Sequence, residues 1–443
     1  MRRLHAWQNG THIGTFHEDD DGSIGFEYDR DDAGGMPISL SLPRSGLWDE
    51  GTPRSFLDNL LPDNPNVREA MRTRLHTAST DMFDLLDGVD ATGGLTFTLS
   101  SDPPSAPPTL SLATDGEIAA EIRRISRTRN IWWDENGRCR FSLGGAQGKF
   151  TLTRIGGQWF WPDAALPSTH IVKPEPHDAE HAAAVEHATM AMARACGIPV
   201  PPEGVIDAEG ERAFLVERFD RRTSEDGRLL RIRQEDFLQA MGRPAADKYD
   251  VTADDCIRML RRAGHGDGLV YEWLERLAFN TAIADSDAHA KNYSLLLDPS
   301  TGIRLAPAYD LVATRYWVRF DQELAMPIRD DDEFAEWTTP ESWRDLARRN
   351  LLDEDRVVDM ARRTAGKVLS TAEGTIRELG IDPAVGQRLL ECWHKANEAI
   401  RPIPPAAAPE PPSVAPPTAT PVPDPPSSPM NSPHLPSAGT PLP

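Results

Sequence analysis

Apolar and polar residues alternate over short runs near the start of the chain, as is typical of half-buried strands. The runs lie at residues 4–8, 12–16 and 24–28 and are separated by the turn signals Asn9-Gly10 and Asp21-Gly22. Similar runs predict further strands at residues 140–143, 149–155, 158–161 and 169–172.

Apolar residues recur at helical spacing in other parts of the chain. Helices are expected at residues 55–62, 66–75 and 181–196, and helical texture dominates residues 253–400. The pattern predicts an α+β protein in which a β-rich part precedes a helical lobe. Enzymes that bind a nucleotide in a cleft between two lobes have this order, although fold class alone does not prove that function.

Three changes in composition divide the chain. Residues 101–108 are rich in proline, the strand-rich texture ends near residue 239, and 17 of the 43 residues from Arg401 onward are proline. This predicts four parts, namely a β-rich N-terminal subdomain (1–105), an α/β lobe (106–238), a helical lobe (239–400) and a tail (401–443). The tail is expected to be disordered with polyproline II character, because it lacks the apolar residues that would offset its ordering entropy.

The charge of the chain limits its direct partners. With 47 basic and 69 acidic side chains, the formal net charge is −22, which opposes binding of nucleic acid over a broad face. Any role at DNA would require a basic partner protein. No window approaches eighteen uncharged apolar residues, and the N-terminus lacks the apolar core of a signal peptide. We therefore expect no membrane span, a cytoplasmic location, and four reduced cysteines, since none forms a CxxC motif.

A polar segment after the helix expected at residues 273–284 carries the candidate chemistry. Asp287 is followed five places later by Asn292, and Asp310 follows a predicted hairpin that would bring it beside Asn292. Protein kinases supply, in this order, a carboxylate that orients the attacking hydroxyl and two magnesium ligands. The hard oxygen donors of Asn292 and Asp310 suit a hard cation. The order predicts phosphoryl transfer with Asp287 as the catalytic carboxylate.

Two upstream features fit the same chemistry. Lys173 ends a strand-like run, where a lysine directed at phosphates would lie, and Glu186 follows in a predicted helix, where it could pair with Lys173. Residues 141–149 (FSLGGAQGK) contain three glycines, which could turn backbone amides toward phosphate oxygens. The stretch is not a Walker A loop, because Phe150 follows Lys149. Taken alone, the loop fits a plain glycine hairpin better.

Two other interpretations of the polar segment stay open. Asp285, Asp287 and Asn292 could be cap and turn residues, and Asp310 could be an N-cap. Asp285, Asp287 and His289 are spaced by two and could instead bind a divalent ion in a hydrolase. No second His/Asp cluster with ligand spacing accompanies them in the sequence, whereas the kinase interpretation also accounts for the upstream lysine and glutamate.

Several of these stretches occur together, and in the same order, in one known family. From about Trp7 through His394 the chain resembles the HipA family of bacterial serine/threonine toxin kinases. The matching stretches are residues 56–63 (FLDNLLPD), 141–149 (FSLGGAQGK), 169–173 (THIVK), 216–221 (VERFDR), 233–236 (RQED), 287–292 (DAHAKN) and 307–310 (PAYD).

The resemblance implies a two-lobed, protein-kinase-like fold with ATP and magnesium as cofactors. It also implies a small helix-turn-helix antitoxin as partner and co-repressor, with DNA bound only through that antitoxin. The implied substrate is a protein, an aminoacyl-tRNA synthetase in the best-known members, and the enzyme also phosphorylates itself. The alternative is a catalytically weak chain that serves chiefly as the co-repressor subunit of its antitoxin on DNA.

The resemblance also implies roles for single residues. Lys173 would bind phosphate, Asp287 would be the catalytic aspartate, His289 would support the catalytic loop, and Asn292 and Asp310 would bind magnesium. The nucleotide would be surrounded by Gly144, Gly145, Ala146, Gln147, Lys149, Lys173, Glu186, Glu217, Phe219 and Gln234, with Glu217 and Phe219 at the adenine hinge.

Ser142 would be the site of autophosphorylation. The chain departs from the family loop at Gly144, where alanine is usual, and at Gly148, where an acidic residue is usual. The loop is therefore expected to be more mobile than in the family, and its contacts with ATP are less well defined by the resemblance. The proline-rich tail has no expected counterpart in the family.

Overall fold

The computed structural model describes residues 1–29, 35–104, 110–128, 141–145, 147–163, 165–264, 266–329 and 334–404. Ala146 of the glycine-bearing loop, Cys139 and the proline-rich tail from residue 405 onward lie outside these residues.

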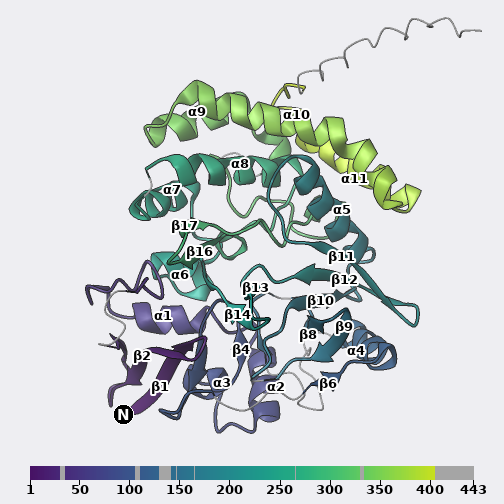
Figure 1. Cartoon of the computed structure of the whole chain (residues 1–443). Coiled ribbons are helices and arrows are strands. Elements are labelled where there is room, and N and C mark those ends of the chain that lie inside the picture. Colours follow the sequence, from purple (N-terminus) through teal and green to yellow (C-terminus); the bar gives the residue numbers. More distant parts are fainter. Residues whose placement is uncertain are drawn as a thin grey trace, which may run out of the picture. The chain divides into compact units, whose positions relative to one another are not determined.

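The N-terminal part is built around an antiparallel sheet. Its strands β1 (Arg2–Gln8), β2 (Thr11–Glu18), β3 (Ile24–Tyr28) and β5 (Thr96–Thr98) pair in the order β3-β2-β1-β5. Helices α1 (Thr52–Asp58), α2 (Pro65–Leu75) and α3 (Met82–Leu86) lie beside the sheet (Figure 1). The sheet and helices share a core in which the ring of Phe16 contacts those of Phe26, Phe56 and Phe97. The three strands expected at the start of the chain are confirmed.

A second sheet of six strands follows. Its order is β11 (Glu203–Ala208), β12 (Glu211–Glu217), β10 (His170–Pro174), β8 (Phe150–Ile155), β9 (Gln158–Trp161) and β6 (Ser111–Leu112). Helices α4 (Asp115–Arg127) and α5 (Ala182–Ala195) pack against it. Strand β10 lies inside the sheet between β12 and β8, with antiparallel pairing on both sides. Two parallel residue pairs join β4 (Asp90–Ala91) of the N-terminal part to β7 (Phe141–Ser142).

The helical part forms the upper half of Figure 1. Its α-helices are α6 (Phe237–Met241), α7 (Ala253–Arg262), α8 (Gly268–Ala282), α9 (Pro340–Arg349), α10 (Glu354–Leu379) and α11 (Pro383–Ala396). The short 3-10 helices are η1 (Ala245–Asp247), η2 (Ala290–Asn292), η3 (Thr314–Tyr316) and η4 (Ala335–Trp337). The remaining strands are β13 (Arg221–Thr223), β14 (Leu229–Arg231), β15 (Arg233–Asp236), β16 (Ser294–Asp298) and β17 (Gly302–Leu305).

Apolar helix faces and capping residues explain this arrangement. Trp273, Trp343 and Trp393, from three different helices, are at most 1% exposed and lie in one continuous core. Thr252 begins α7 with a reciprocal capping box, which satisfies two backbone groups at the helix start. Gly380 ends α10 with φ +62°, a conformation that glycine adopts without a Cβ clash. Packing and caps therefore both favour helices in this half of the chain.

The α+β organisation expected from the sequence is confirmed, and so is the hairpin formed by β16 and β17. Residues Met1–Pro405 form one compact unit by their contacts. The division of these residues into three parts stays a prediction.

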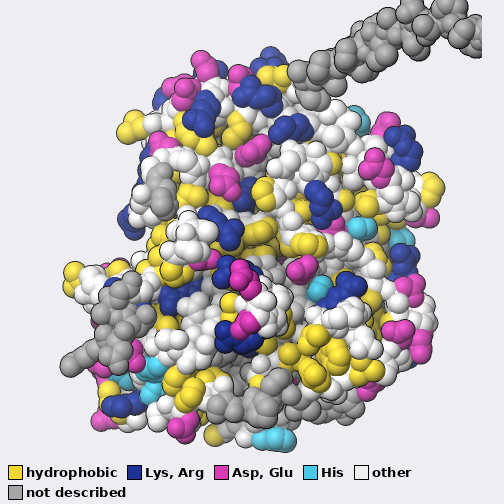
Figure 2. Space-filling view, viewed as in Figure 1, with side chains coloured by type: hydrophobic (Ala, Val, Ile, Leu, Met, Phe, Trp, Pro, Cys, Tyr) yellow, Lys and Arg dark blue, Asp and Glu magenta, His cyan; other side chains and the backbone are white. Residues whose placement is uncertain are grey.

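The surface carries both signs of charge. On the face shown in Figure 2, basic and acidic side chains are interspersed and do not form one large basic patch. Within the described residues, no helix combines the length and the apolar character needed to cross a bilayer.

The packed part of the chain continues a few residues past the composition change at Arg401. Ile400 is 5% exposed, and the amide of Ile403 donates to the carbonyl of Arg362 on α10 over 3.0 Å. A Cβ on Gly366 would lie 1.7 Å from the carbonyl oxygen of Ile403. Glycine at this helix position therefore allows the backbone around Ile403 to lie against α10.

Removing residues 405–443 is expected to leave the melting temperature nearly unchanged, because their composition offers little apolar surface to bury. Ending the chain at Ile400 should instead destabilise it by about 1–2 kcal/mol, since the contacts of Ile403 with α10 are then lost. Thermal unfolding of the two truncated chains beside the full chain measures both effects. Equal melting temperatures for the two truncations would contradict the role given to Ile403.

Candidate active site

One cavity gathers almost all of the residues singled out from the sequence. Its volume is about 640 Å³, and it lies between the second sheet and the helical part. Among the residues that the structure describes, every candidate site residue except Ser142 lines it. Those residues are Gly144, Gly145, Gln147, Lys149, Lys173, Glu186, Glu217, Phe219, Gln234, Asp287, His289, Asn292 and Asp310.

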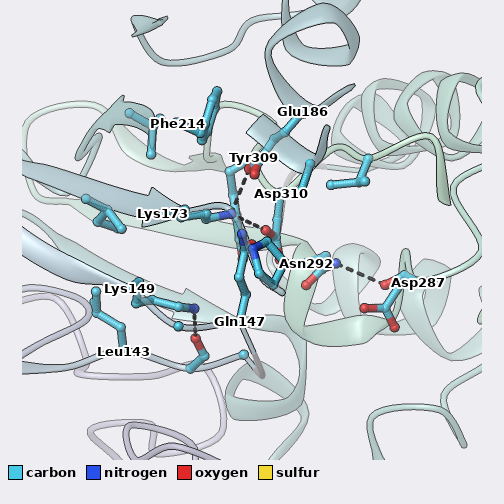
Figure 3. Close-up of a pocket in the computed structure, with 18 of the residues that line it drawn as sticks. Leu143, Gln147, Lys149, Lys173, Glu186, Phe214, Asp287, Asn292, Tyr309 and Asp310 are labelled. Atoms are coloured by element: carbon cyan, nitrogen blue, oxygen red, sulfur yellow. Dashed lines mark hydrogen bonds and ion pairs between the residues drawn. The ribbon is translucent and has the colours of Figure 1, made fainter. Parts of the chain in front are cut away.

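Lys173 connects three elements at the centre of the cavity (Figure 3). It projects from β10, and its side chain is 8% exposed. Its Nζ donates to Glu186 Oε1 of α5 over 2.7 Å and to Asp310 Oδ1 over 2.5 Å. The predicted pairing of Lys173 with Glu186 is thus present, and Asp310, whose side chain is 39% exposed, completes a triad around the buried lysine.

The triad is electrostatically coupled. Burial lowers the pKa of Lys173, but the carboxylates of Asp310 and Glu186 outweigh burial and hold that pKa above its usual value. Burial would raise the pKa of Asp310, but Lys173 and Lys149 hold it well below its usual range. Lys173 is therefore a cation and Asp310 an anion at neutral pH, as phosphate and metal binding require.

Lys149 adds a second cation below the triad. Its Nζ donates to the carbonyl of Gly144 over 2.5 Å, which closes the glycine-bearing loop on itself. Burial and the charge of Lys173 lower the pKa of Lys149 to about 8. Gly145 has φ +91°, and a Cβ there would lie 2.9 Å from Lys149 Nζ. Glycine at residue 145 therefore leaves room for the contact between Lys149 and the carbonyl of Gly144.

The segment after α8 holds Asp287 and Asn292 in a fixed turn. Ala284 has φ +56°, which reverses the chain directly before Asp285. The buried carboxylate of Asp285 accepts from the amides of Asp287 (3.1 Å) and Val312 (3.3 Å). Burial and the charge of Asp287 raise the pKa of Asp285 well above its usual range. Asp285 therefore shapes the turn.

Asn292 has an orientation that suits a metal ligand. Its Nδ2 donates to the backbone carbonyl of Asp287 over 3.0 Å, so Oδ1 is the atom that could bind a cation (Figure 3). Asp310 has φ +56°, a strained backbone conformation of a kind found at functional sites. Oδ1 of Asp310 accepts the hydrogen bond from Lys173, so Oδ2 is the oxygen that stays available for a cation. One amide oxygen and one carboxylate oxygen are a donor set that fits Mg²⁺, which keeps its other positions for water and phosphate.

The hydrolase interpretation finds no support in this geometry. In the described ranges of the chain, no group of three or more His, Cys, Asp and Glu side chains is arranged to hold a metal ion. The ring of His289 packs edge-on against Tyr249. Asp285 is occupied by backbone amides, as described above.

The residues expected around the adenine lie at the cavity wall. Glu217 ends β12, and the ring of Phe219 lies 5.3 Å from that of Tyr309. Gln234 of β15 donates from Nε2 to Ser294 Oγ over 2.7 Å, which fixes its side chain beside the cavity. The structure thus brings these three residues together with the phosphate-side residues, although they are far apart in the sequence.

Ser142 differs from the other candidates because it does not reach the cavity. Its side chain is fully buried, and Oγ donates to the carbonyl of Leu60 over 2.5 Å. Residue 142 also pairs with Ala91 in the parallel β4–β7 ladder. Phosphorylation of Ser142 would therefore require the loop to leave its position in this structure.

Two contacts between the N-terminal part and the site were missed by sequence reasoning. Lys291 is 8% exposed, and its Nζ donates to Asn59 Oδ1 (2.7 Å) and pairs with Asp236 (2.9 Å). Lys248 pairs with Asp63 over 3.1 Å. The signal in the sequence was a pair of polar residues, Asn59 and Asp63, within the apolar stretch 56–63. The N-terminal part therefore supports the catalytic segment directly.

A strand lysine paired with a helix glutamate, followed by an Asp/Asn loop and a further aspartate around one cavity, defines a two-lobed, kinase-like fold. Comparison with family models agrees. Residues 4–98 match the HipA N-terminal domain and residues 141–372 match the HipA-like C-terminal domain. The chain belongs to the HipA family, as its resemblance suggested.

Similar proteins are named as kinases. The chain is 33% identical over 398 residues to the Sinorhizobium fredii protein named "Putative kinase Y4mE", covering 86% of this chain and 92% of the relative. It is 29% identical over 326 residues to the serine/threonine-protein kinase toxin HipA of Shewanella oneidensis, covering 68% of this chain and 71% of that protein.

A solved structure confirms the fold. The structure of the Shewanella oneidensis toxin–antitoxin system HipA, HipB and its operator DNA complex matches with a TM-score of 0.75. The match has 23% sequence identity and covers 90% of this chain and 96% of the other. The predicted two-lobed α+β fold with a helical C-terminal lobe is confirmed.

Proposed function

We propose that the chain is an ATP- and magnesium-dependent serine/threonine protein kinase that acts as the toxin of a toxin–antitoxin pair. The observation that carries this proposal is the placement of Lys173, Glu186 and Asp310 in one triad that lines the same cavity as Asp287 and Asn292. This is the set of groups that phosphoryl transfer requires.

The residues take distinct roles in the proposal. Lys173 binds phosphate oxygens as a cation and is oriented by Glu186. Asn292 and Asp310 hold magnesium, which when bound neutralises the charge of the phosphates. Asp287 accepts the hydrogen bond of the attacking hydroxyl and takes its proton as the bond from the hydroxyl oxygen to the γ-phosphorus forms and the bond from that phosphorus to ADP breaks. His289 supports the loop through its packing, and the glycine-bearing loop with Lys149 covers the phosphates.

The proposed partners follow from the family and from the charge of the chain. The Shewanella HipA is seen with HipB and operator DNA. For this chain we propose a helix-turn-helix antitoxin as partner, with DNA reached through it, because a net charge of −22 opposes direct binding to the phosphate backbone. The proposed substrate is a cellular protein, with an aminoacyl-tRNA synthetase as the first candidate.

Incubation of the purified full chain with γ-labelled ATP and magnesium tests the proposal. A kinase transfers label to itself and to a protein of the host lysate, whereas a co-repressor without catalysis transfers none. Identification of the labelled lysate protein then names the substrate. Absence of transfer in the presence of magnesium, with ATP binding intact, would favour the co-repressor alternative.

Phosphorylation of Ser142 is expected to switch the enzyme off. A phosphate adds a charge of about −1.5 to −2, and the fully buried position beside Leu60 offers no room for it. The modified loop should leave the cavity and carry its amides away from ATP. Mass spectrometry after ATP treatment, with Asp287→Ala as control, should find phosphate on Ser142 in the active protein alone. A phosphorylated form that binds ATP as tightly as the unmodified one would disprove the switch.

A further inference from the structure

The carboxylate of Asp287 already has a hydroxyl donor in this structure. Tyr249 lies between η1 and α7, and its Oη donates to Asp287 Oδ1 over 2.8 Å. Among the described residues, Tyr249 is the one hydrogen-bond donor to the side chain of Asp287. Asn292 donates to the backbone carbonyl of Asp287 instead. A serine or threonine hydroxyl that is about to be phosphorylated would make the same kind of contact.

The tyrosine is held at this position from two sides. Its ring packs edge-on against His289 of the same loop as Asp287, with centroids 5.1 Å apart. The ammonium group of Lys248 lies 5.1 Å from the ring centroid, and the backbone carbonyl of Lys248 accepts from the amide of Ala290 over 3.3 Å. The segment that carries Tyr249 is therefore attached to the catalytic loop, and the phenol is aimed at Asp287 by these contacts.

The tyrosine can also leave this position at low cost. Its side chain is 54% exposed and lines the cavity at the same time. A rotation into solvent would break one hydrogen bond and the contacts of the ring with His289 and the Lys248 ammonium group, while the segment itself stays anchored through the backbone of Lys248. Burial and the charge of Asp287 raise the pKa of Tyr249, so its hydroxyl remains a donor at neutral pH.

We propose that the hydroxyl of Tyr249 occupies the acceptor position at Oδ1 of Asp287, and that an acceptor hydroxyl reaches this oxygen by displacing the phenol. This inference rests on the proposed kinase function. Water is the smallest competing acceptor, and Asp287 could orient water as readily as a side-chain hydroxyl. Tyr249 then keeps water from Oδ1 of Asp287 until a protein acceptor, which brings further contacts, displaces the phenol.

Hydrolysis of ATP in the absence of any other protein tests the proposal. In Tyr249→Phe the ring still packs on His289 but no longer donates to Asp287. We expect the initial rate of ADP release to rise about threefold to tenfold, the range that corresponds to the net contribution of one ordinary, solvent-exposed hydrogen bond. The dissociation constant for ATP with magnesium should stay unchanged, because the hydroxyl contacts the carboxylate and not the triad.

Tyr271→Phe is the matched control. In the unmodified chain Tyr271 lies on α8, and its hydroxyl accepts from the amide of Asp353 over 3.2 Å. Tyr271 does not line the cavity. This variant should hydrolyse ATP at the rate of the unmodified chain. Tyr249→Leu, which lacks both ring and hydroxyl, provides a second variant and should also show faster hydrolysis.

The outcomes separate this inference from the proposed function. An unchanged or slower release of ADP in both Tyr249 variants, with ATP binding intact, would overturn it, because the hydroxyl would then assist Asp287 or play no part. Transfer of label by the unmodified chain would still support the kinase function in that case. If the unmodified chain neither labels protein nor hydrolyses ATP, the proposed function fails and this inference fails with it.

Discussion

Replacing Asp287 by alanine is expected to stop phosphoryl transfer while ATP stays bound, whereas Asp310→Ala should abolish magnesium-dependent nucleotide binding. Asp287 lines the cavity apart from the Lys173 triad, so its loss should leave ATP bound. The substitution does remove the group that we propose to orient and deprotonate the acceptor. General base catalysis contributes about 10²–10⁴-fold, and the transfer rate should fall by that amount. In the proposed site Asp310 would supply one of two protein oxygens for magnesium, and its loss would leave the phosphate charge uncompensated.

Calorimetric titration with ATP, with and without magnesium, measures the binding half of this prediction, and transfer of label measures the catalytic half. The two variants serve as controls for each other because each loses one carboxylate. Asp310→Asn is a further check, since it keeps the shape of the side chain beside Lys173 but lowers its charge. Equal loss of ATP binding in Asp287→Ala and Asp310→Ala would show that the roles are assigned wrongly.

Local patterns in the sequence were enough to predict the elements that carry the site. The turn Asn9-Gly10, the strand that ends in Lys173 and the hairpin after Asn292 all depend on neighbours within a few residues. The order of lysine, glutamate, Asp/Asn loop and aspartate then indicated one site, because a known chemistry uses these groups in that order. Their meeting around one cavity agrees with that prediction.

Contacts between distant segments could not be predicted in the same way. Lys291 stands in a polar loop and would be expected to face solvent, yet it is buried against Asn59, which lies 232 positions earlier. The bond from Tyr249 to Asp287 spans 38 positions and has no periodic signal. Pairings of this kind depend on how the lobes pack, and a single sequence contains no local trace of that packing.

A cluster of ion pairs between distant segments joins the N-terminal part to the residues proposed for the adenine hinge. Asp90 of β4 is 2% exposed and forms ion pairs with Arg218 (3.4 Å), Arg221 (2.8 Å) and Arg231 (3.1 Å). Burial would raise the pKa of Asp90, but these three arginines hold it well below its usual range. The carboxylate is therefore charged at neutral pH, and the stability it contributes is lost only as the pH falls through its lowered pKa.

Asp90→Ala is expected to destabilise the folded chain by about 3–5 kcal/mol, because it removes one of the two buried carboxylates, Asp90 and Asp220, that pair with these arginines. For a protein of this size we expect the melting temperature to fall by roughly 5–10 °C. ATP affinity should also fall, since Arg218 lies between the hinge residues Glu217 and Phe219 and donates to the carbonyl of Ala91.

Thermal unfolding and ATP titration of Asp90→Ala measure both effects, and Asp226→Ala is the matched control. Asp226 pairs with Arg228 on an exposed turn over 2.7 Å, where solvent screens the ion pair. The control should therefore melt with the unmodified chain. Asp90→Asn should lie between the two, because it keeps a side chain that can bond Ser168 while losing the charge. If Asp90→Ala melts no lower than the control, the three arginines do not depend on this carboxylate, and the hinge must be held by its backbone contacts instead.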